Sequence, residues 1–354
     1  MDYNSLISCI NQAESLSDPQ VINSEQRQRL RQACEKLSAR LETPLDRLRR
    51  VTSGCYELPF LKLAVDTGIF DLFNEHKETG AEFHVSEIAA HTKTDPLLIG
   101  RIVRFLTAVG FFDVTVEGKV KATRFSQSVT PKSIVHDSIL LSGLYAAPFV
   151  RLPWYLKETK YQIPDNGYSG PFQYALNTDL HFFDWLDTHT PERDAFHRMM
   201  EASKSSTSAN WTDYLTEDRF QELVSSNQTP FTFVDVGGGF FDPQPVHSAD
   251  VYLLARILHD WPDVQARQIL AHIREAMGPE SVLFVFERVF PDALHETNPG
   301  DVVTDATMMA IFASLERSEG QFKDLFDSVG LKMVHAWRRH AEDDVQAVLE
   351  IVRS

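Results

Sequence analysis

The chain has 354 residues and a mass of 40.3 kDa, enough for two domains, and its hydrophobic content of 43% can fill a core in each. A formal net charge of -16 makes a nucleic-acid partner improbable, because an acidic surface repels phosphate. The three cysteines, Cys9, Cys34 and Cys55, lack the Cys/His pairing of a zinc site, so we expect free thiols and no metal.

The first elements predict a helical N-terminal region. The segment Met1–Asn4 lacks a basic signal-peptide start, and no apolar stretch approaches the roughly 20 residues that cross a bilayer, so we expect a cytoplasmic protein without membrane contact. Apolar residues fall on one face of a helix over Ser24–Leu41. A more apolar helix is expected around Leu58–Phe73, with Gly68 ending or bending it.

The next segment predicts a winged helix. Residues 85–90 and 95–109 have helical patterns, and two strands follow around a turn at Glu117-Gly118. Residues 130–218 then form a helical stretch dense in aromatic side chains. We expect prolines 153, 164, 171 and 191, with Gly167 and Gly170, to break that stretch into short pieces.

The C-terminal part alternates strands and helices. Strands are expected at Phe231–Val236, Asp250–Leu258 and Val282–Phe286, with an amphipathic helix over Asp263–Met277. This alternation predicts a parallel α/β sheet with helices on its faces.

A glycine turn follows the first of these strands. Gly237, Gly238 and Gly239 would let backbone N–H groups approach a nucleotide-like ligand, and Asp235 could cap the turn or contact that ligand. A triple glycine at a strand end is more often a simple tight turn, so the pattern alone is weak.

A histidine stands at the predicted end of the second strand, where open parallel sheets place their ligands. His259 could accept a proton near neutral pH, and Asp260 beside it could fix its orientation. Glu287, at the end of the next strand, and Glu316, before a helix, could hold the imidazole from other sides. Taken singly, each of these residues more often has a structural role: a histidine at a strand end is more often a satisfied core residue, and Glu316 suits a helix N-terminus.

Several segments in this order resemble the plant and fungal class of S-adenosylmethionine-dependent O-methyltransferases. The resemblance extends over nearly the whole chain from about residue 55, and Ile-Leu-His-Asp-Trp-Pro-Asp (257–263) is its most specific part. The other matching segments are Phe-Val-Asp-Val-Gly-Gly-Gly (233–239), Leu-Glu-Arg-Ser (315–318), Gly-Pro-Phe-Gln-Tyr-Ala (170–175), Gly-Ile-Phe (68–70), Thr-Asp-Pro-Leu-Leu (94–98) and Gly-Phe (110–111).

The resemblance implies an O-methyltransferase of secondary metabolism with a Rossmann-like domain. His259 would deprotonate the acceptor hydroxyl, flanked by Glu287 and Glu316, while Asp235 and the glycine turn would hold S-adenosylmethionine. A winged-helix-like domain (1–128) would form a homodimer, a helical region (129–225) would contact the substrate, and a shortened α/β domain (226–354) would carry the chemistry. The substrate would be a phenol, enol or polyketide-like molecule. Its binding site would be lined by Phe172, Phe183, Trp185, Met199, Met308, Met309 and Phe312. Residues of these types are more often part of an ordinary core.

The chain departs from the family after Gly239. The family continues through two further strands that carry an acid for the ribose and residues around the adenine, and one βαβ unit alone needs roughly 30 residues. Here residues 240–246 already resemble the lead-in to the strand before His259. The family's basic residue four positions before the histidine is also replaced, by Ala255, with Arg256 next to it.

Three hypotheses follow from this mixture. The first is a methyltransferase whose predicted protein has lost a segment. The second is an enzyme on the methyltransferase fold that catalyses a cyclisation, elimination or pericyclic step without the cofactor. The third is a catalytically silent dimer partner or a regulatory protein, for which DNA binding is disfavoured by the acidic charge.

Overall fold

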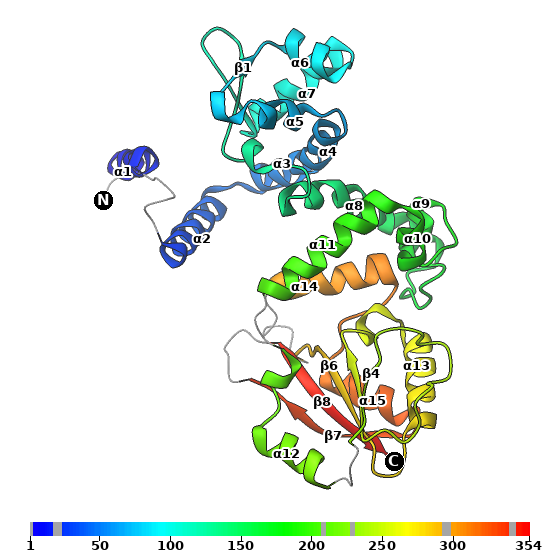
Figure 1. Ribbon diagram of the computed structural model, residues 1–354. Helices are drawn as coiled ribbons and strands as arrows, with labels where there is room; N and C mark the ends of the chain where they lie inside the picture. The colour runs from blue at the N-terminus through cyan, green and yellow to red at the C-terminus, as the bar shows by residue number, and fades with distance from the viewer. Residues whose placement is uncertain (1–2, 17–22, 207–209, 227–230, 292–298, 340–344) are drawn as a thin grey trace.

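The computed structural model describes residues 3–16, 23–206, 210–226, 231–291, 299–339 and 345–354. The described residues form three parts that follow one another from top to bottom of Figure 1. A helical N-terminal region is followed by a helical layer, and an α/β domain with a mixed sheet ends the chain.

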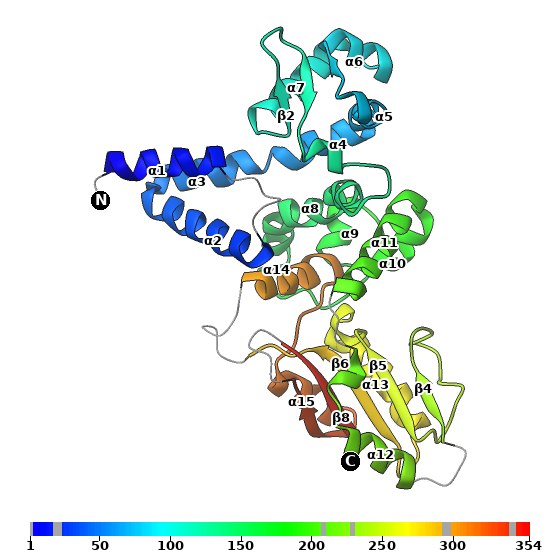
Figure 2. The ribbon, with the colours of Figure 1, turned by 60° about the vertical axis from the view of Figure 1, so that its left-hand side comes forward.

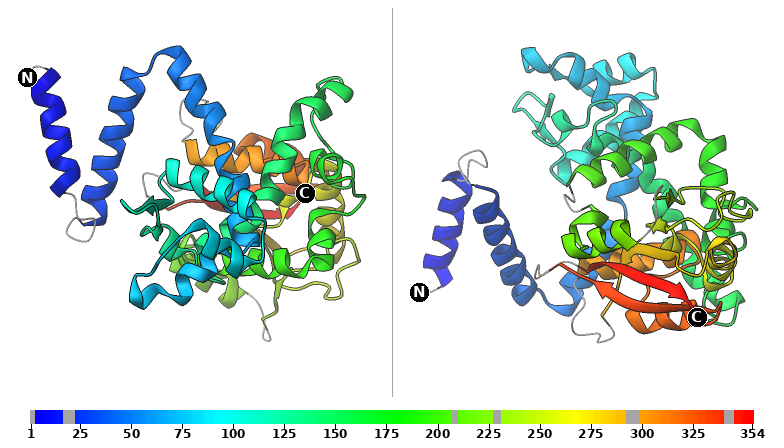
Figure 3. Two further views of the ribbon diagram at one scale, coloured as in Figure 1. Left: turned by 90° about the horizontal axis from the view of Figure 1, so that it is seen from above. Right: turned by 60° about the horizontal axis from the view of Figure 1, so that its bottom comes forward.

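The first three helices form an arm that extends away from the rest of the chain (Figures 1 and 3). They are α1 (Tyr3–Leu16), α2 (Ser24–Leu41) and α3 (Pro44–Gly54), and α2 has the bounds expected from the sequence. Asn23 caps α2, and Thr43 with Asp46 forms a capping box at the start of α3. No residue of α3 is buried, although apolar side chains line it.

A winged-helix arrangement follows, as predicted. Its helices are α4 (Glu57–Asp66), α5 (Ile69–Glu75), α6 (Val85–Thr92) and α7 (Pro96–Ala108). Its small antiparallel sheet has the order β1 (Glu82–Phe83), β3 (Val120–Ala122), β2 (Phe112–Val114). Gly68, in the left-handed conformation, separates α4 from α5 and so ends the predicted helix at that point.

The helical layer corrects one expectation. Pro153 does not break the chain, because α8 (Ile134–Glu158) runs continuously through both Pro148 and Pro153. The helix survives since it packs against α4, α9 (Pro171–Leu176) and α11 (Thr190–Ser206), and tertiary packing offsets the lost hydrogen bonds. The layer is completed by α10 (Phe182–Thr188), α14 (Pro299–Thr307) and the π-helical turn η6 (Met308–Phe312).

Helix α8 is also long and apolar enough to cross a membrane, by length and composition alone, which the sequence analysis did not expect. Its Asp137 is fully buried and pairs with Arg198 of α11, with 2.6 Å between Oδ2 and Nε. A buried ion pair with a neighbouring helix is typical of an interior helix of a folded domain.

The α/β domain contains a five-stranded sheet in the order β4-β5-β6-β8-β7. The first three strands, β4 (Phe233–Asp235), β5 (Val251–Ala255) and β6 (Val282–Arg288), are parallel to one another, as expected. The strands β7 (Leu331–Trp337) and β8 (Gln346–Arg353) form an antiparallel hairpin paired to β6.

Helices cover both faces of this sheet (Figures 1 and 2). The helices α13 (Asp263–Ala276) and α15 (Glu319–Asp327) pack with β5, β6 and β8 around one apolar core. On the other face lie α12 (Glu217–Ser226) and the short turn η3 (Trp211–Asp213). The strand β4 is three residues long and forms one edge of the sheet.

Candidate functional site

His259 lies on a short 3-10 turn, η4 (Leu258–Asp260), and not at a strand end. The strand β5 ends four residues earlier, at Ala255, which corrects the predicted bound of Leu258. Arg256 then adopts φ +56°, and this left-handed residue turns the chain from the strand into η4. The turn therefore stands at the carboxyl edge of the parallel strands, where open α/β sheets bind ligands.

Three carboxylates surround the His259 imidazole, as the sequence predicts. Nδ1 lies 3.7 Å from Glu287 Oε2 and 3.5 Å from Glu316 Oε1, and Nε2 lies 3.5 Å from Asp260 Oδ1. The side chains of Glu287 and Glu316 are fully buried, whereas His259 is 19% exposed. The imidazole therefore faces buried carboxylates, and part of the ring is accessible to solvent.

The carboxylates change the protonation of this histidine. Burial alone would lower the pKa of His259, but Asp260, Glu287 and Glu316 together raise it to about 10. Burial raises the pKa of Asp260 to about 7 against the effect of the imidazolium, and it raises the pKa of Glu287 as well. The three carboxylates thus favour the protonated imidazole at neutral pH, whereas the sequence analysis expected His259 to accept a proton there.

Glu287 also fixes the backbone of the turn. Its Oε1 accepts hydrogen bonds from the N–H groups of Ile257 (2.8 Å), Leu258 (2.7 Å) and His259 (3.4 Å). One carboxylate on β6 therefore orients both the turn and the ring that the turn carries.

The predicted cofactor residues do not assemble into a nucleoside site. Gly237, Gly238 and Gly239 are exposed, and a Cβ placed on any of them would meet no atom within 4 Å, so the glycine turn is open. Asp235 is exposed at the sheet edge. Among the described residues no strand lies outside β4, where a ribose-binding acid and an adenine wall would be carried.

The segment after the glycine turn packs instead on the site's own elements. The Phe241 ring meets the Trp261 ring edge-on, with centroids 4.7 Å apart, and the Phe240 carbonyl lies 3.2 Å from His272 Nδ1 of α13. The residues present therefore do not fit S-adenosylmethionine beyond the glycine turn and Asp235.

Six of the seven predicted substrate residues gather in one apolar cluster of the helical layer; they are Phe172, Phe183, Trp185, Met199, Met308 and Phe312. Met309 is half-buried and lies outside that cluster. Phe172 is fully buried and Trp185 stacks on His189 at 3.5 Å, so both contribute to packing. Phe183 and Phe312 lie nearer the site, because both rings neighbour His181.

Two residues of the site were missed by the sequence analysis. His181 is 1% exposed and stacks on Trp261 at 4.4 Å, and its Nε2 has no hydrogen-bond partner among the described residues. Burial lowers the pKa of His181 to about 4, so this ring is neutral. Tyr145 of α8 has its pKa raised to about 12 by burial and by the charge of Asp260. Neither residue stands in a motif, so only the tertiary contacts identify them.

We call the group Tyr145, His181, Phe182, Phe183, Trp261 and Phe312 the aromatic cluster. It adjoins the site because Trp261 follows His259 by two residues and Tyr145 interacts with Asp260. Phe182 connects the group, with ring centroids 5.0 Å from Phe312 and 6.4 Å from Tyr145.

Fold and site together define an α/β protein of the methyltransferase type, with a winged-helix N-terminal region and an acid-flanked histidine at the sheet's carboxyl edge. Residues 216–332 match the sequence profile of the O-methyltransferase domain. The chain is 26% identical to demethylsterigmatocystin 6-O-methyltransferase of Aspergillus parasiticus, over 82% of this chain and 84% of that protein. The chain is thus similar over most of its length to fungal O-methyltransferases, and its residues 216–332 match the O-methyltransferase domain.

Solved structures show the same fold. OxaC, in complex with sinefungin and meleagrin, superposes with a TM-score of 0.74 at 20% identity, covering 99% of this chain and 98% of OxaC. A pericyclic reaction enzyme superposes with a TM-score of 0.73 at 22% identity, covering 100% of both chains. Structural relatives include complexes with S-adenosylmethionine.

Proposed function

We propose that this chain acts on a small phenol, enol or polyketide-like natural product and that His259 transfers a proton to or from its oxygen. The observation that carries this proposal is the imidazole enclosed by Asp260, Glu287 and Glu316 and open on one side. The aromatic cluster beside it supplies the apolar surface that such a substrate needs. The relatives support the substrate class, since meleagrin is bound to OxaC.

The protonation of the site favours a reaction that needs no methyl donor. The imidazolium of His259 can give a proton to a carbonyl or leaving hydroxyl oxygen of the substrate, and ionised Asp260 can take a proton from a neighbouring C–H or O–H group. One proton enters and one leaves, so a dehydration or a cyclisation is balanced without a cofactor. The incomplete nucleoside site points in the same direction.

Methyl transfer from S-adenosylmethionine is the second candidate. It is favoured by the family and by the open glycine turn at Gly237–Gly239, which together with Asp235 would hold part of the donor. Bound there, the donor would supply an electrophilic methyl group, and His259 would have to give up its proton before it could act as the base. The missing strands beyond β4 disfavour this reaction for the chain as it stands.

The alignment with the Aspergillus parasiticus enzyme supports a shortening of the chain. It is 336 positions long but spans 82% of this chain, about 290 residues, so about 46 positions lie opposite gaps in this chain. We propose that most of them correspond to the strands missing after Gly239. The mass of the native protein decides whether that segment is absent, since a chain with it would exceed 40.3 kDa.

One experiment separates the candidate reactions. The purified chain and its His259→Asn variant are incubated with aromatic polyketide phenols, demethylsterigmatocystin among them, with and without S-adenosylmethionine, and the products are analysed by mass spectrometry. We expect an isomer or a dehydrated product, formed without the donor and lost in the variant. A product one methyl group heavier, formed only with the donor, would establish methyl transfer instead. If neither product forms and no phenol binds, the chain is a silent partner.

A further inference from the structure

Arg317 is the largest side chain in the described structure that is fully buried, with 1% exposure. All three of its guanidinium nitrogens donate hydrogen bonds. Nη1 donates to the Leu258 carbonyl (2.7 Å), Nη2 to the Trp261 carbonyl (2.9 Å) and to Asp263 Oδ1 (2.9 Å), and Nε to the same Asp263 oxygen (3.2 Å). A buried charge this completely satisfied holds its partners in one geometry.

The two carbonyls that Arg317 binds belong to the residues on either side of His259 and Asp260. Glu287 binds the N–H groups at the beginning of the same turn. A buried anion therefore holds the N–H end of η4 and a buried cation holds its carbonyl end, which matches the direction of the peptide dipoles. Buried side chains therefore hydrogen-bond to the turn at both of its ends.

Arg317 is itself firmly placed. Its backbone carbonyl accepts from the Phe290 N–H (3.0 Å), just beyond the end of β6, and its side chain packs over the Phe322 ring of α15. The residue before it is Glu316, whose carboxylate faces the imidazole. Glu316 thus faces the His259 imidazole, and its neighbour Arg317 hydrogen-bonds to the turn that carries that ring.

We propose that Arg317 is a positioning residue, which keeps the His259 ring between Glu287 and Glu316 by fixing the backbone of residues 258–261. If Arg317 had only a structural role, it would stabilise the fold but would not set the position of the His259 ring. Its part in turnover rests on the proposed function, whereas the placement of the ring does not, so the two are tested separately.

The test uses the full-length chain with labelled histidine, and the His259→Asn variant assigns the ring signal. A pH titration of the imidazole signals by NMR measures the protonation of His259. Hydrogen exchange measures how fast the amides of residues 257–261 exchange. In Arg317→Gln we expect the titration of His259 to move from about 10 toward its ordinary value of 6.5, and the amides to exchange at least about tenfold faster.

Arg267 provides the matched control. It lies on α13 and pairs with the other oxygen of Asp263 (3.2 Å), but in the described structure it makes no bond to the turn. Arg267→Gln should leave both readouts unchanged. If Arg317→Gln also leaves both unchanged, the proposal is wrong.

A conservative variant covers the case in which Arg317→Gln does not fold. Arg317→Lys keeps the charge, but one ammonium group cannot reach Leu258, Trp261 and Asp263 together with the geometry of the guanidinium fork. We expect it to fold with faster exchange in residues 257–261 and a partial shift in the titration of His259. Wild-type behaviour of Arg317→Lys in both measurements would overturn the proposal. Neither measurement needs a substrate, so they stand even if the proposed reaction fails.

Discussion

The histidine of this site differs from a free histidine because of three neighbouring charges. Asp260 follows it in the chain, whereas Glu287 and Glu316 reach it from a strand and from a loop. Burial opposes the charge on the ring, but the carboxylates outweigh burial and raise the pKa of His259 to about 10. The proposed function uses this proton on His259 at neutral pH.

This protonation predicts a bell-shaped pH–rate profile for the cofactor-free reaction. Asp260 accepts a proton only when ionised, so the rate should rise as pH increases through about 7. His259 donates only when protonated, so the rate should fall as pH increases through about 10. Initial rates measured by product quantification test both limbs, and Asp260→Asn should lower the rate at every pH, because it removes the proton acceptor. A rate that keeps rising above pH 10 would contradict the role of donor and favour that of base.

At the scale of elements, the edge strand β4 explains why the cofactor site is incomplete. Parallel sheets bind nucleosides in the crevice between strand ends on either side of a switch in strand order. Here β5 flanks β4 on one side, and no strand flanks it on the other among the described residues. The Trp211 ring stacks on Phe233 at 5.5 Å and covers part of that edge. In the described part of the chain the glycine turn is present, but no strand supplies the second wall of the crevice.

In helix α8, tertiary packing outweighs the tendency of Pro153 to break a helix. Pro153 is exposed and cannot donate to the carbonyl four residues earlier, yet the helix continues. Pro153→Ala should therefore stabilise the fold, by about 1 to 3 kcal/mol, because it restores a hydrogen bond without changing a buried contact. Thermal unfolding measures the effect. Pro148→Ala is a contrasting variant, since Pro148 is buried and its removal also loses packing. An unchanged or lower melting temperature for Pro153→Ala would count against this explanation.

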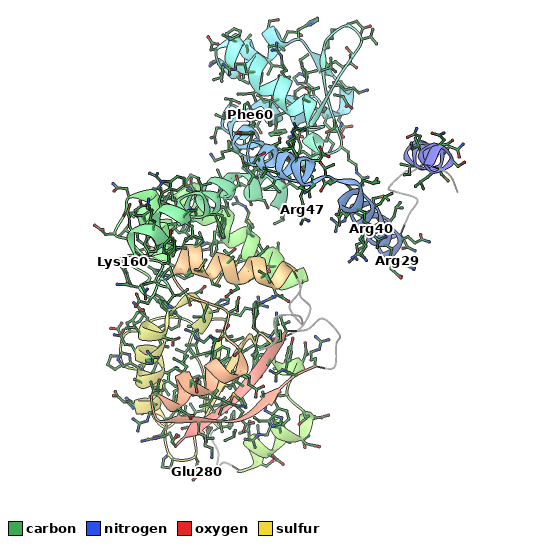
Figure 4. All side chains as sticks on the ribbon, turned by 180° about the vertical axis from the view of Figure 1, so that it is seen from behind. Arg29, Arg40, Arg47, Phe60, Lys160 and Glu280 are labelled. Carbon is green, nitrogen blue, oxygen red and sulfur yellow. The ribbon has the colours of Figure 1, made fainter. Side chains whose placement is uncertain are left out.

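At the scale of the whole molecule, the N-terminal arm exposes apolar side chains among its charged ones. Leu45, Leu48 and Val51 of α3 are each more than half exposed. Figure 4 shows the labelled arginines of α2 and α3 along the same arm, away from the α/β domain. Isolated helices of this length are marginally stable in water, so a partner surface is expected to cover their apolar side.

We propose that a second copy of this chain covers the arm, as the family resemblance implies. Light scattering should give about twice the monomer mass of 40.3 kDa. The double variant Leu48→Glu with Val51→Glu should move that mass toward the monomer, because it places charges in the apolar contact. Lys160→Glu, at an exposed position of the helical layer (Figure 4), is the control and should remain dimeric. A wild-type chain that is monomeric at all concentrations would exclude this arrangement.

The sequence by itself determined the order of the elements and the chemical identity of the site. Helical periodicity located α2 and α7, and alternating strands and helices predicted the parallel part of the sheet. The motif around His259 and the acids at 287 and 316 could be chosen from sequence, because His259 and Glu287 stand near the ends of predicted parallel strands and the family resemblance adds Glu316. The short distance from Gly239 to the next strand was visible as well, since strand and helix lengths set a minimum for a further βαβ unit.

Only the tertiary structure decided the electrostatics and the supporting contacts. The protonation of His259 depends on distances to three carboxylates and on burial, which no local pattern encodes. The roles of Tyr145, His181 and Arg317 depend on neighbours from other parts of the chain. The continuity of α8 through Pro153 also depends on tertiary contacts, because the packing of many residues outweighs the cost of one proline inside the helix.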